Sequence, residues 1–253
     1  MTKLSVNINK LATLRNSRGG NLPDVAVAAA RILNWGAHGI TVHPRPDGRH
    51  IRTADVTAVN AVVRERNVTD KAKKEFNVEG YPSTAYLAIL ADVRPDQATL
   101  VPDPPEALTS SAGWRLAQNE QLLRGVVAEI KTHGIRVSIF IEPETMTEDD
   151  FLALARIGTD RVELYTEAFA KTANTGQERE ILKIYQATAE RIRDLRIGIN
   201  AGHDLNQNNL SSLITWIPWI DEVSIGHALI SEALYDGLEK TVKNYLRVLG
   251  WQK

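Results

Sequence analysis

Residues 136–167 read RVSIFIEPETMTEDDFLALARIGTDRVELYTE and contain one complete copy of the pattern that decides the fold. The run 136–141 is apolar and rich in β-branched residues, which predicts a strand. A polar cluster follows, and then a helical pattern that begins at Thr147 among acidic residues and ends at Gly158. A second strand is predicted over 161–164. This order predicts two parallel strands joined by a crossover helix.

The same unit recurs along the whole chain. We predict strands at residues 4–8, 39–42, 74–78, 97–101, 136–141, 161–164, 197–200 and 222–225. We predict helices at residues 24–35, 54–66, 119–132, 147–157, 178–195 and 230–249. The pattern is weakest over residues 69–113. Eight strand–helix units in 253 residues are typical of a closed (β/α)₈ TIM barrel, so we predict one α/β domain spanning residues 1–253.

Composition narrows the class of protein. Lysine and arginine number 30 against 31 acidic residues, so bulk positive charge does not favour a nucleic acid or an acidic membrane as partner. The chain has no cysteine, which excludes disulfides, thiolate metal sites and cysteine nucleophiles. No apolar run is long enough for a secretion signal or a membrane span. We therefore predict a cytoplasmic protein without a membrane partner.

Acid–base groups recur where the predicted strands end. His43 follows the second strand and Glu79 the third, while Glu163 lies at the sixth and His203 follows the seventh. His227 follows the eighth. The catalytic groups of such barrels lie at the carboxyl ends of the strands. Imidazoles and carboxylates transfer protons near neutral pH, so this rim predicts acid–base catalysis.

Groups that bind anions lie at the same rim. Arg18, Arg45 and Arg49 follow the first two strands, and arginine donates parallel hydrogen bonds to phosphate. Gly202 and Gly226 open the last two loops, where barrels often bind phosphate through backbone N–H groups. We predict a phosphorylated substrate. No H-x-H or H-E-x-x-H spacing occurs, so we predict no metal site.

The chain resembles the pyridoxine 5′-phosphate synthase family, in motifs that keep the family's order along nearly the whole chain. They are VNINKLATLRNSRG (6–19), GITVHPR (39–45), RHI (49–51), NVE (77–79), LVP (100–102), NAGH (200–203) and IGHA (225–228). The resemblance implies a (β/α)₈ barrel with additional helices, a homo-octamer and no organic cofactor. It also implies condensation of 3-amino-2-oxopropyl phosphate with 1-deoxy-D-xylulose 5-phosphate to pyridoxine 5′-phosphate, phosphate and water.

The resemblance also implies residue roles. His43 and Glu79 would be proton acceptors, His203 a proton donor, and Glu163 a stabiliser of charge in a transition state. The amino-ketone phosphate would be held by Asn7, Arg18, Gly226 and His227, with Asp204 beside them. The deoxyxylulose phosphate would be held by Asn9, Lys10, Arg45, His50 and Thr109, and the loop around Thr109 would close over the bound substrates.

Three single positions and one short run depart from the common family pattern. Asn9 and Lys10 stand where Asp-His is frequent, and Asp204 stands where glycine is common. Residues 109–113 replace a Thr-Thr-Glu-Gly-Gly run. Two alternatives therefore stay open: another phosphosugar barrel enzyme, such as an aldolase with Lys10 as a Schiff-base nucleophile, and a non-catalytic barrel that binds a phosphorylated metabolite.

Overall fold

The computed structural model describes residues 1–102 and 112–251, in which eight parallel strands close into a barrel. The strands follow one another around the barrel in chain order, and β1 closes it by pairing with both β2 and β8. They are β1 (Lys3–Asn7), β2 (Gly39–Val42), β3 (Glu75–Gly80), β4 (Gln97–Leu100), β5 (Arg136–Ile141), β6 (Arg161–Tyr165), β7 (Gly198–Gly202) and β8 (Glu222–Ile225). The predicted (β/α)₈ barrel is confirmed.

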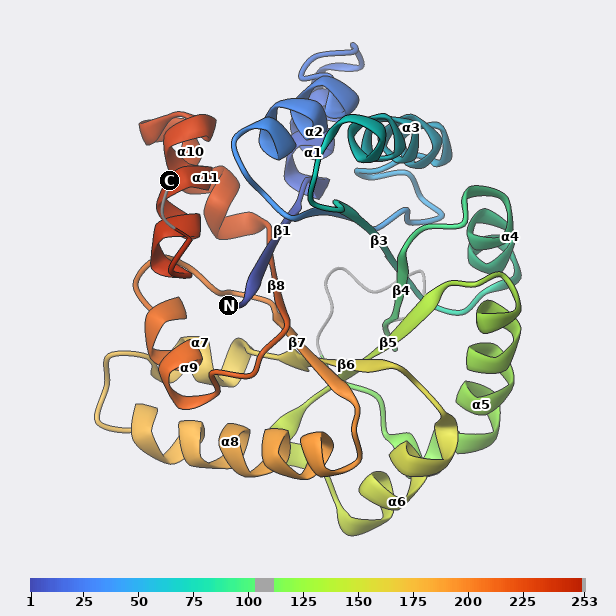
Figure 1. Cartoon of the computed structure of the whole chain (residues 1–253), viewed down its shortest axis with the longest axis vertical. Helices are drawn as coiled ribbons and strands as arrows, with labels where there is room; N and C mark the ends of the chain where they lie inside the picture. The colour runs from blue at the N-terminus through green and yellow to red at the C-terminus, as the bar shows by residue number, and fades with distance from the viewer. Residues whose placement is uncertain (103–111, 252–253) are drawn as a thin grey trace.

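Helices surround the barrel, as Figure 1 shows in a view with the strands at the centre. They are α1 (Asn9–Arg18), α2 (Val25–Asn34), α3 (Thr53–Thr69), α4 (Thr84–Val93), α5 (Leu116–Thr132), α6 (Glu148–Ile157), α7 (Glu167–Thr172), α8 (Glu178–Asp194), α9 (Leu210–Trp216), α10 (His227–Asp236) and α11 (Leu238–Val248). A 3₁₀ turn, η1 (Pro143–Thr145), precedes α6. Within the described ranges, no helix combines the length and apolarity that crossing a membrane requires.

Local signals account for the helix ends that the sequence predicts. The carboxylate of Asp24 accepts hydrogen bonds from the backbone N–H groups of Ala26 and Val27, at 2.8 and 2.9 Å, and so caps α2. Thr147 and Asp150 form a reciprocal capping box at the start of α6. The helix ends at Gly158, whose φ of 79° is left-handed and favours glycine.

Two predictions need correction. The helix predicted over residues 230–249 is two helices, α10 and α11, because Gly237 has a φ of 81° and interrupts the helical backbone. The segment after β1, for which we predict no helix, is the helix α1. The unclear region between residues 69 and 113 contains α4, which begins where the Ser83 hydroxyl accepts from the N–H of Tyr86. The short helices α7 and α9 were also missed.

The interior of the barrel is polar. Outward-facing residues of the strands, such as Leu4 and Phe76, pack with the helices in the main hydrophobic core. The alternating residues carry side chains that hydrogen-bond to one another across neighbouring strands: Ser5 to Thr41 at 2.7 Å and Thr99 to Asn77 at 3.0 Å. A barrel of this class is usually filled with Val, Ile and Leu. Here hydrogen bonds replace apolar packing along the axis.

Candidate active site

A cavity of about 300 Å³ lies at the carboxyl end of the barrel, and twelve of the fourteen predicted site residues line it. They come from most of the strand ends and the loops that follow. The twelve are Asn7, Asn9, Lys10, His43, Arg45, His50, Glu79, Glu163, His203, Asp204, Gly226 and His227. Residues far apart in the sequence are therefore brought to one cavity by closure of the barrel.

An imidazole and a carboxylate face each other at one wall of the cavity. The Nδ1 atom of His43 lies 3.8 Å from Oε2 of Glu79, and both side chains are nearly buried. Asn7 donates its amide to the same Glu79 oxygen at 3.4 Å. Asn9 accepts the backbone N–H of His43 at 2.9 Å and so connects the ends of β1 and β2. These contacts place two proton-transferring groups side by side.

Burial sets the protonation of this pair. It raises the pKa of Glu79 to about 8, because the charged carboxylate loses its hydration. Burial, with His50 and Arg45 acting in the same direction, lowers the pKa of His43 to about 3. Near neutral pH the free protein therefore holds a protonated Glu79 beside a neutral His43. The pair offers both a proton donor and a proton acceptor.

Glu163 projects from β6 into the same cavity. Burial raises the pKa of Glu163 well above its usual value, and the neighbouring carboxyls of Glu79 and Glu222 add to this effect. Within the described residues, its Oε2 atom has no hydrogen-bond partner. A Cβ atom at Gly202 would overlap the other carboxyl oxygen, so glycine at that position provides the space for Glu163. An unpaired buried carboxyl suits contact with a substrate that carries a donor or a positive charge.

His203 lines the cavity from a segment with an uncommon backbone conformation. His203 and Asp204 have φ values of 82° and 57°, both left-handed. This conformation costs about 1–2 kcal/mol for a residue with a Cβ atom. The Tyr165 ring packs against the imidazole with the ring centroids 4.7 Å apart. Oδ2 of Asp204 lies 3.1 Å from Nδ1 of His203. Asp204, the departure from the family pattern, thus contacts the imidazole.

Side chains that can bind an anion line the cavity beside the acid–base pair. They are Lys10 on α1 and Arg45, Arg49 and His50 after β2. Burial lowers the pKa of His50 to about 4, and its Nδ1 atom accepts the N–H of Ile51 at 2.9 Å. The neutral ring therefore carries its proton on Nε2 and can donate it.

Helix α1 holds this cationic loop in place. Arg15 is buried and forms two hydrogen bonds with the Asp55 carboxylate, at 2.6 and 2.8 Å. Arg15 and Asn16 both donate to the backbone carbonyl of His50. The predicted site residues of the second loop are thus fixed by residues that the sequence analysis assigned no role.

A helix N-terminus forms another part of the wall. Helix α10 begins at His227, directly after Gly226, and its first backbone hydrogen bond runs from the N–H of Ile230 to the carbonyl of Gly226. The earlier N–H groups of the helix have no intrahelical acceptor and attract anions. A Cβ atom at Gly226 would lie 3.0 Å from the Cβ of Asn7, so a larger residue would crowd β1.

Two predicted residues remain, one on α1 and one outside the described residues. Arg18 is exposed in the last turn of α1 and does not line the cavity. Thr109, with the proposed closing loop, lies outside the described residues. The structure also adds lining residues that the sequence reasoning missed, including Thr13 and Phe140. A helical pattern over α1 would have found Thr13, which lies one turn after Asn9; Phe140 has no such signal.

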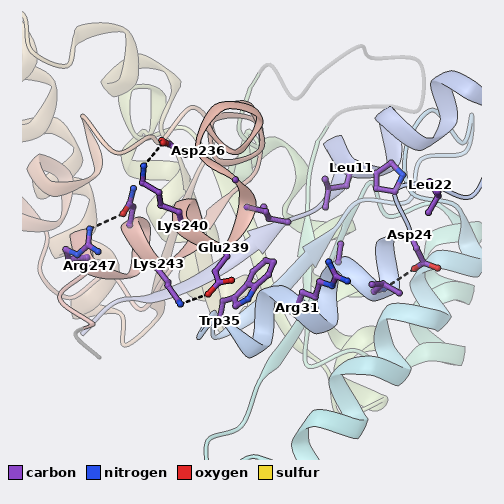
Figure 2. A pocket seen from close by; sticks show the side chains of 16 residues that line it. Leu11, Leu22, Asp24, Arg31, Trp35, Asp236, Glu239, Lys240, Lys243 and Arg247 are labelled. Carbon is purple, nitrogen blue, oxygen red and sulfur yellow. Dashed lines mark hydrogen bonds and ion pairs between the residues drawn. The ribbon is translucent and has the colours of Figure 1, made fainter.

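A larger hollow of about 1010 Å³ lies elsewhere, between α2 and the C-terminal helices. Figure 2 shows its charged side chains paired with one another, as in Lys243 with Glu239 and Lys240 with Asp236. Its lining includes no histidine. The acid–base chemistry therefore belongs to the smaller cavity. Within the described ranges, no group of three or more metal-ligating side chains is arranged around a common point.

The fold and the cavity define a class: a (β/α)₈ barrel enzyme whose cavity is lined by acid–base groups, basic side chains and the start of a helix. Comparison with known proteins narrows this class to one family. Residues 4–250 match the family model of the pyridoxal phosphate biosynthesis protein PdxJ, and the chain belongs to this family.

Curated relatives match this chain over nearly their full length. The chain is 49% identical to pyridoxine 5′-phosphate synthase of Christiangramia forsetii, over 98% of this chain and 100% of the relative. It is 47% identical to the enzyme of the same name from Cytophaga hutchinsonii, over 98% of this chain and 99% of that protein. A solved structure, thiamine phosphate pyrophosphorylase from Pyrococcus furiosus, matches with a TM-score of 0.61 over 98% of this chain and 95% of that one. At 14% identity this structure supports the fold alone.

Proposed function

We propose that this chain is a pyridoxine 5′-phosphate synthase. It joins 3-amino-2-oxopropyl phosphate to 1-deoxy-D-xylulose 5-phosphate and releases pyridoxine 5′-phosphate, inorganic phosphate and water. One observation carries the proposal: relatives of this name match the whole chain at nearly half of its positions, and the corresponding cavity holds proton donors and acceptors. The resemblance inferred from the sequence motifs is confirmed at the level of the family.

The reaction requires protons at several steps. An amine condenses with a carbonyl and loses water, phosphate is eliminated, and the ring closes with a second dehydration. Neutral His43 accepts a proton in this scheme, and His203 donates one. Glu79 holds its proton in the free enzyme, but a cationic substrate or iminium favours the ionised carboxylate, which then accepts a proton. Glu163 stabilises the positive charge that develops beside it.

Two separate anion-binding regions suit two phosphorylated substrates. We assign the amino-ketone phosphate to the α10 N-terminus at Gly226 and His227, next to Asn7. We assign the deoxyxylulose phosphate to Asn9, Lys10, Arg45 and His50. Lys10 is an exposed rim residue that shares its wall with Arg45 and Arg49, a placement that favours anion binding over a Schiff base. The roles of Arg18, Thr109 and Asp204 in substrate binding stay predictions.

The decisive experiment mixes the purified protein with both substrates, without added cofactor, and measures products by mass spectrometry. We expect pyridoxine 5′-phosphate with an equal amount of inorganic phosphate. Each substrate alone is the control and yields no product. A folded protein that makes no pyridoxine 5′-phosphate, with or without added metal ions, would overturn the proposal.

We further propose that the chain assembles into a homo-oligomer, an octamer as in the family. Leu22, Leu234 and Tyr235 are 80%, 72% and 92% exposed, and Leu22 lines the large hollow of Figure 2. These exposed apolar side chains are candidate contacts for a second copy of the chain. Light scattering on the purified protein measures the assembly, and a monomer at micromolar concentration would contradict it. The cytoplasmic location stays a prediction.

A further inference from the structure

The strained segment His203–Asp204 is held from one side by Thr166. Thr166 follows β6 directly and is completely buried. Its backbone N–H donates to the carbonyl of Gly202 at 3.0 Å, and its hydroxyl lies 2.7 Å from the same oxygen. The hydroxyl also contacts the carbonyl oxygen of His203. Both donors of Thr166 are therefore directed at the two carbonyls that flank the His203 side chain.

The position of Thr166 makes this contact informative. Thr166 is the residue before the first turn of α7, where a threonine hydroxyl usually accepts a backbone N–H of the helix. In this structure the side chain makes no capping hydrogen bond. It donates to the end of β7 instead. The hydroxyl thus stabilises the backbone at the end of β7, next to His203, rather than the start of its own helix α7.

A second contact holds the other end of the segment. The Asn209 amide, on a buried side chain, donates to the carbonyl of Asp204 at 3.1 Å. The Tyr165 ring restricts the imidazole itself. Two consecutive non-glycine residues keep a left-handed backbone only when the surrounding structure holds them in that conformation. Thr166 and Asn209 supply hydrogen bonds that hold it here.

We propose that Thr166 is a positioning residue for the reaction, acting through His203. Thr166 is completely buried and is not among the residues that line the cavity. Its hydroxyl fixes the peptide groups on both sides of His203 and so fixes the direction in which the imidazole points. The inference rests on the proposed function of His203 as proton donor. Displacing a catalytic group by about 1 Å costs up to a hundredfold in rate.

The structure offers a matched control on the same strand. Thr159 precedes β6 at the opposite end of the barrel, is buried, and its hydroxyl also lies between two backbone carbonyls, those of Val137 and Arg161, each at 2.9 Å. The variants Thr166→Val and Thr159→Val each remove one such hydroxyl with little change in volume. Thr166→Ser retains the hydroxyl and serves as the rescue variant.

The first readout is turnover with both substrates. We expect Thr166→Val to lower kcat by tenfold or more with KM changed less than threefold, and Thr166→Ser to recover most of the rate. We expect the two valine variants to lose similar amounts of thermal stability. Thr159→Val should nevertheless keep its kcat within threefold of wild type. Equal losses of kcat in the two valine variants, or a kcat within threefold of wild type in Thr166→Val, would overturn the proposal.

The second readout does not depend on activity. The chain has six histidines, and imidazole NMR signals of histidine-labelled protein can be assigned to His203 by their loss in His203→Asn. We expect the His203 signal to shift in Thr166→Val and to stay in place in Thr159→Val. An unchanged signal in Thr166→Val would overturn the positioning role. A wild-type protein that forms no pyridoxine 5′-phosphate would instead overturn the proposed function. The NMR result would still show whether the Thr166 hydroxyl holds His203 in place.

Discussion

Two buried carboxyl groups at opposite ends of β3 differ in their ionisation. Glu75 and Glu79 lie four residues apart on β3, and their side chains are 10% and 13% exposed. Burial raises the pKa of both groups. At Glu75, hydrogen bonds from Arg136 and Lys3 outweigh burial and bring the pKa down to about 2. At Glu79, burial alone acts, and the pKa is about 8.

This difference separates a structural carboxylate from a reactive one. The amino-terminal end of the barrel surrounds Glu75 with cations, so its charge is satisfied before any ligand binds. The carboxyl-terminal end leaves Glu79 with an amide from Asn7 and a neutral imidazole. A group that the protein does not satisfy is available to the substrate. Burial also raises the pKa of Glu222, at the amino-terminal end, to about 7. The cavity that Glu79 lines, rather than electrostatics alone, therefore assigns the proposed chemistry to the carboxyl end of the barrel.

The largest expected effect tests Glu79 as a reactive group. Glu79→Gln keeps the shape of the side chain and removes its ability to exchange a proton, so we expect turnover to fall about a hundredfold or more. The measurement is the rate of pyridoxine 5′-phosphate formation at saturating substrates. His203→Asn should give a loss of similar size. Wild-type rates in these variants would remove both residues from the mechanism.

Glu75→Gln tests the opposite end of the comparison. The change leaves Arg136 and Lys3 without their carboxylate, and breaking a buried ion pair from one side costs about 3 kcal/mol. We expect this loss in the free energy of unfolding by urea at neutral pH, with turnover lowered only a few-fold. Because the folded-state pKa of Glu75 is depressed, the stabilising effect is lost as the pH falls from about 4.5 toward 2. A variant as stable as wild type at neutral pH would contradict this account.

Gly202→Ala tests whether the reactive end depends on space around its carboxyls. The added methyl group overlaps the Glu163 carboxyl, which must move. We expect turnover to fall by about tenfold because a catalytic group is displaced. Gly125→Ala is the matched control, since a methyl group there meets open space. If both variants keep wild-type turnover, the position of Glu163 does not limit the reaction.

The smallest expected effect is on the pH dependence of stability. The folded-state pKa of Glu79 is raised, so the folded protein binds a proton more tightly than the unfolded chain between about pH 4.5 and 8. Stability from this group is therefore lost as the pH rises through that range. We expect Glu79→Gln to raise Tm relative to wild type at pH 8, by several degrees more than at pH 5. Equal differences at both pH values would show that burial does not shift the pKa of Glu79.

Sequence reasoning located most of the site because barrel closure brings all strand ends to one rim. His43, Glu79 and His203 needed only their place after a predicted strand. Arg18 is the counterexample: its position after the first strand predicted a place in the cavity, but α1 carries it outward to an exposed last turn. The strand prediction does not distinguish a loop from a helix that follows it.

The polar interior of the barrel is visible in the sequence as an alternation of polar and apolar residues, but the sequence does not show what the polar residues contact. Lys3, Ser5 and Asn7 alternate with apolar residues along β1. Parallel strands are usually buried on both faces and apolar throughout. Only the closed barrel shows that these side chains meet partners on strands that are not their neighbours, as Asn7 of β1 donates to Glu79 of β3 at 3.4 Å.

The sequence by itself determined the repeating strand–helix order, the helix ends at Asp24, Thr147 and Gly158, and the residue types available at the rim. These depend on local periodicity, capping and backbone freedom, which act over a few residues. Only the tertiary structure decided that Glu75 is ionised and Glu79 is not, and that Thr166 contacts His203. Those outcomes depend on burial and on neighbours that are distant in the sequence, and chain folding alone brings them together.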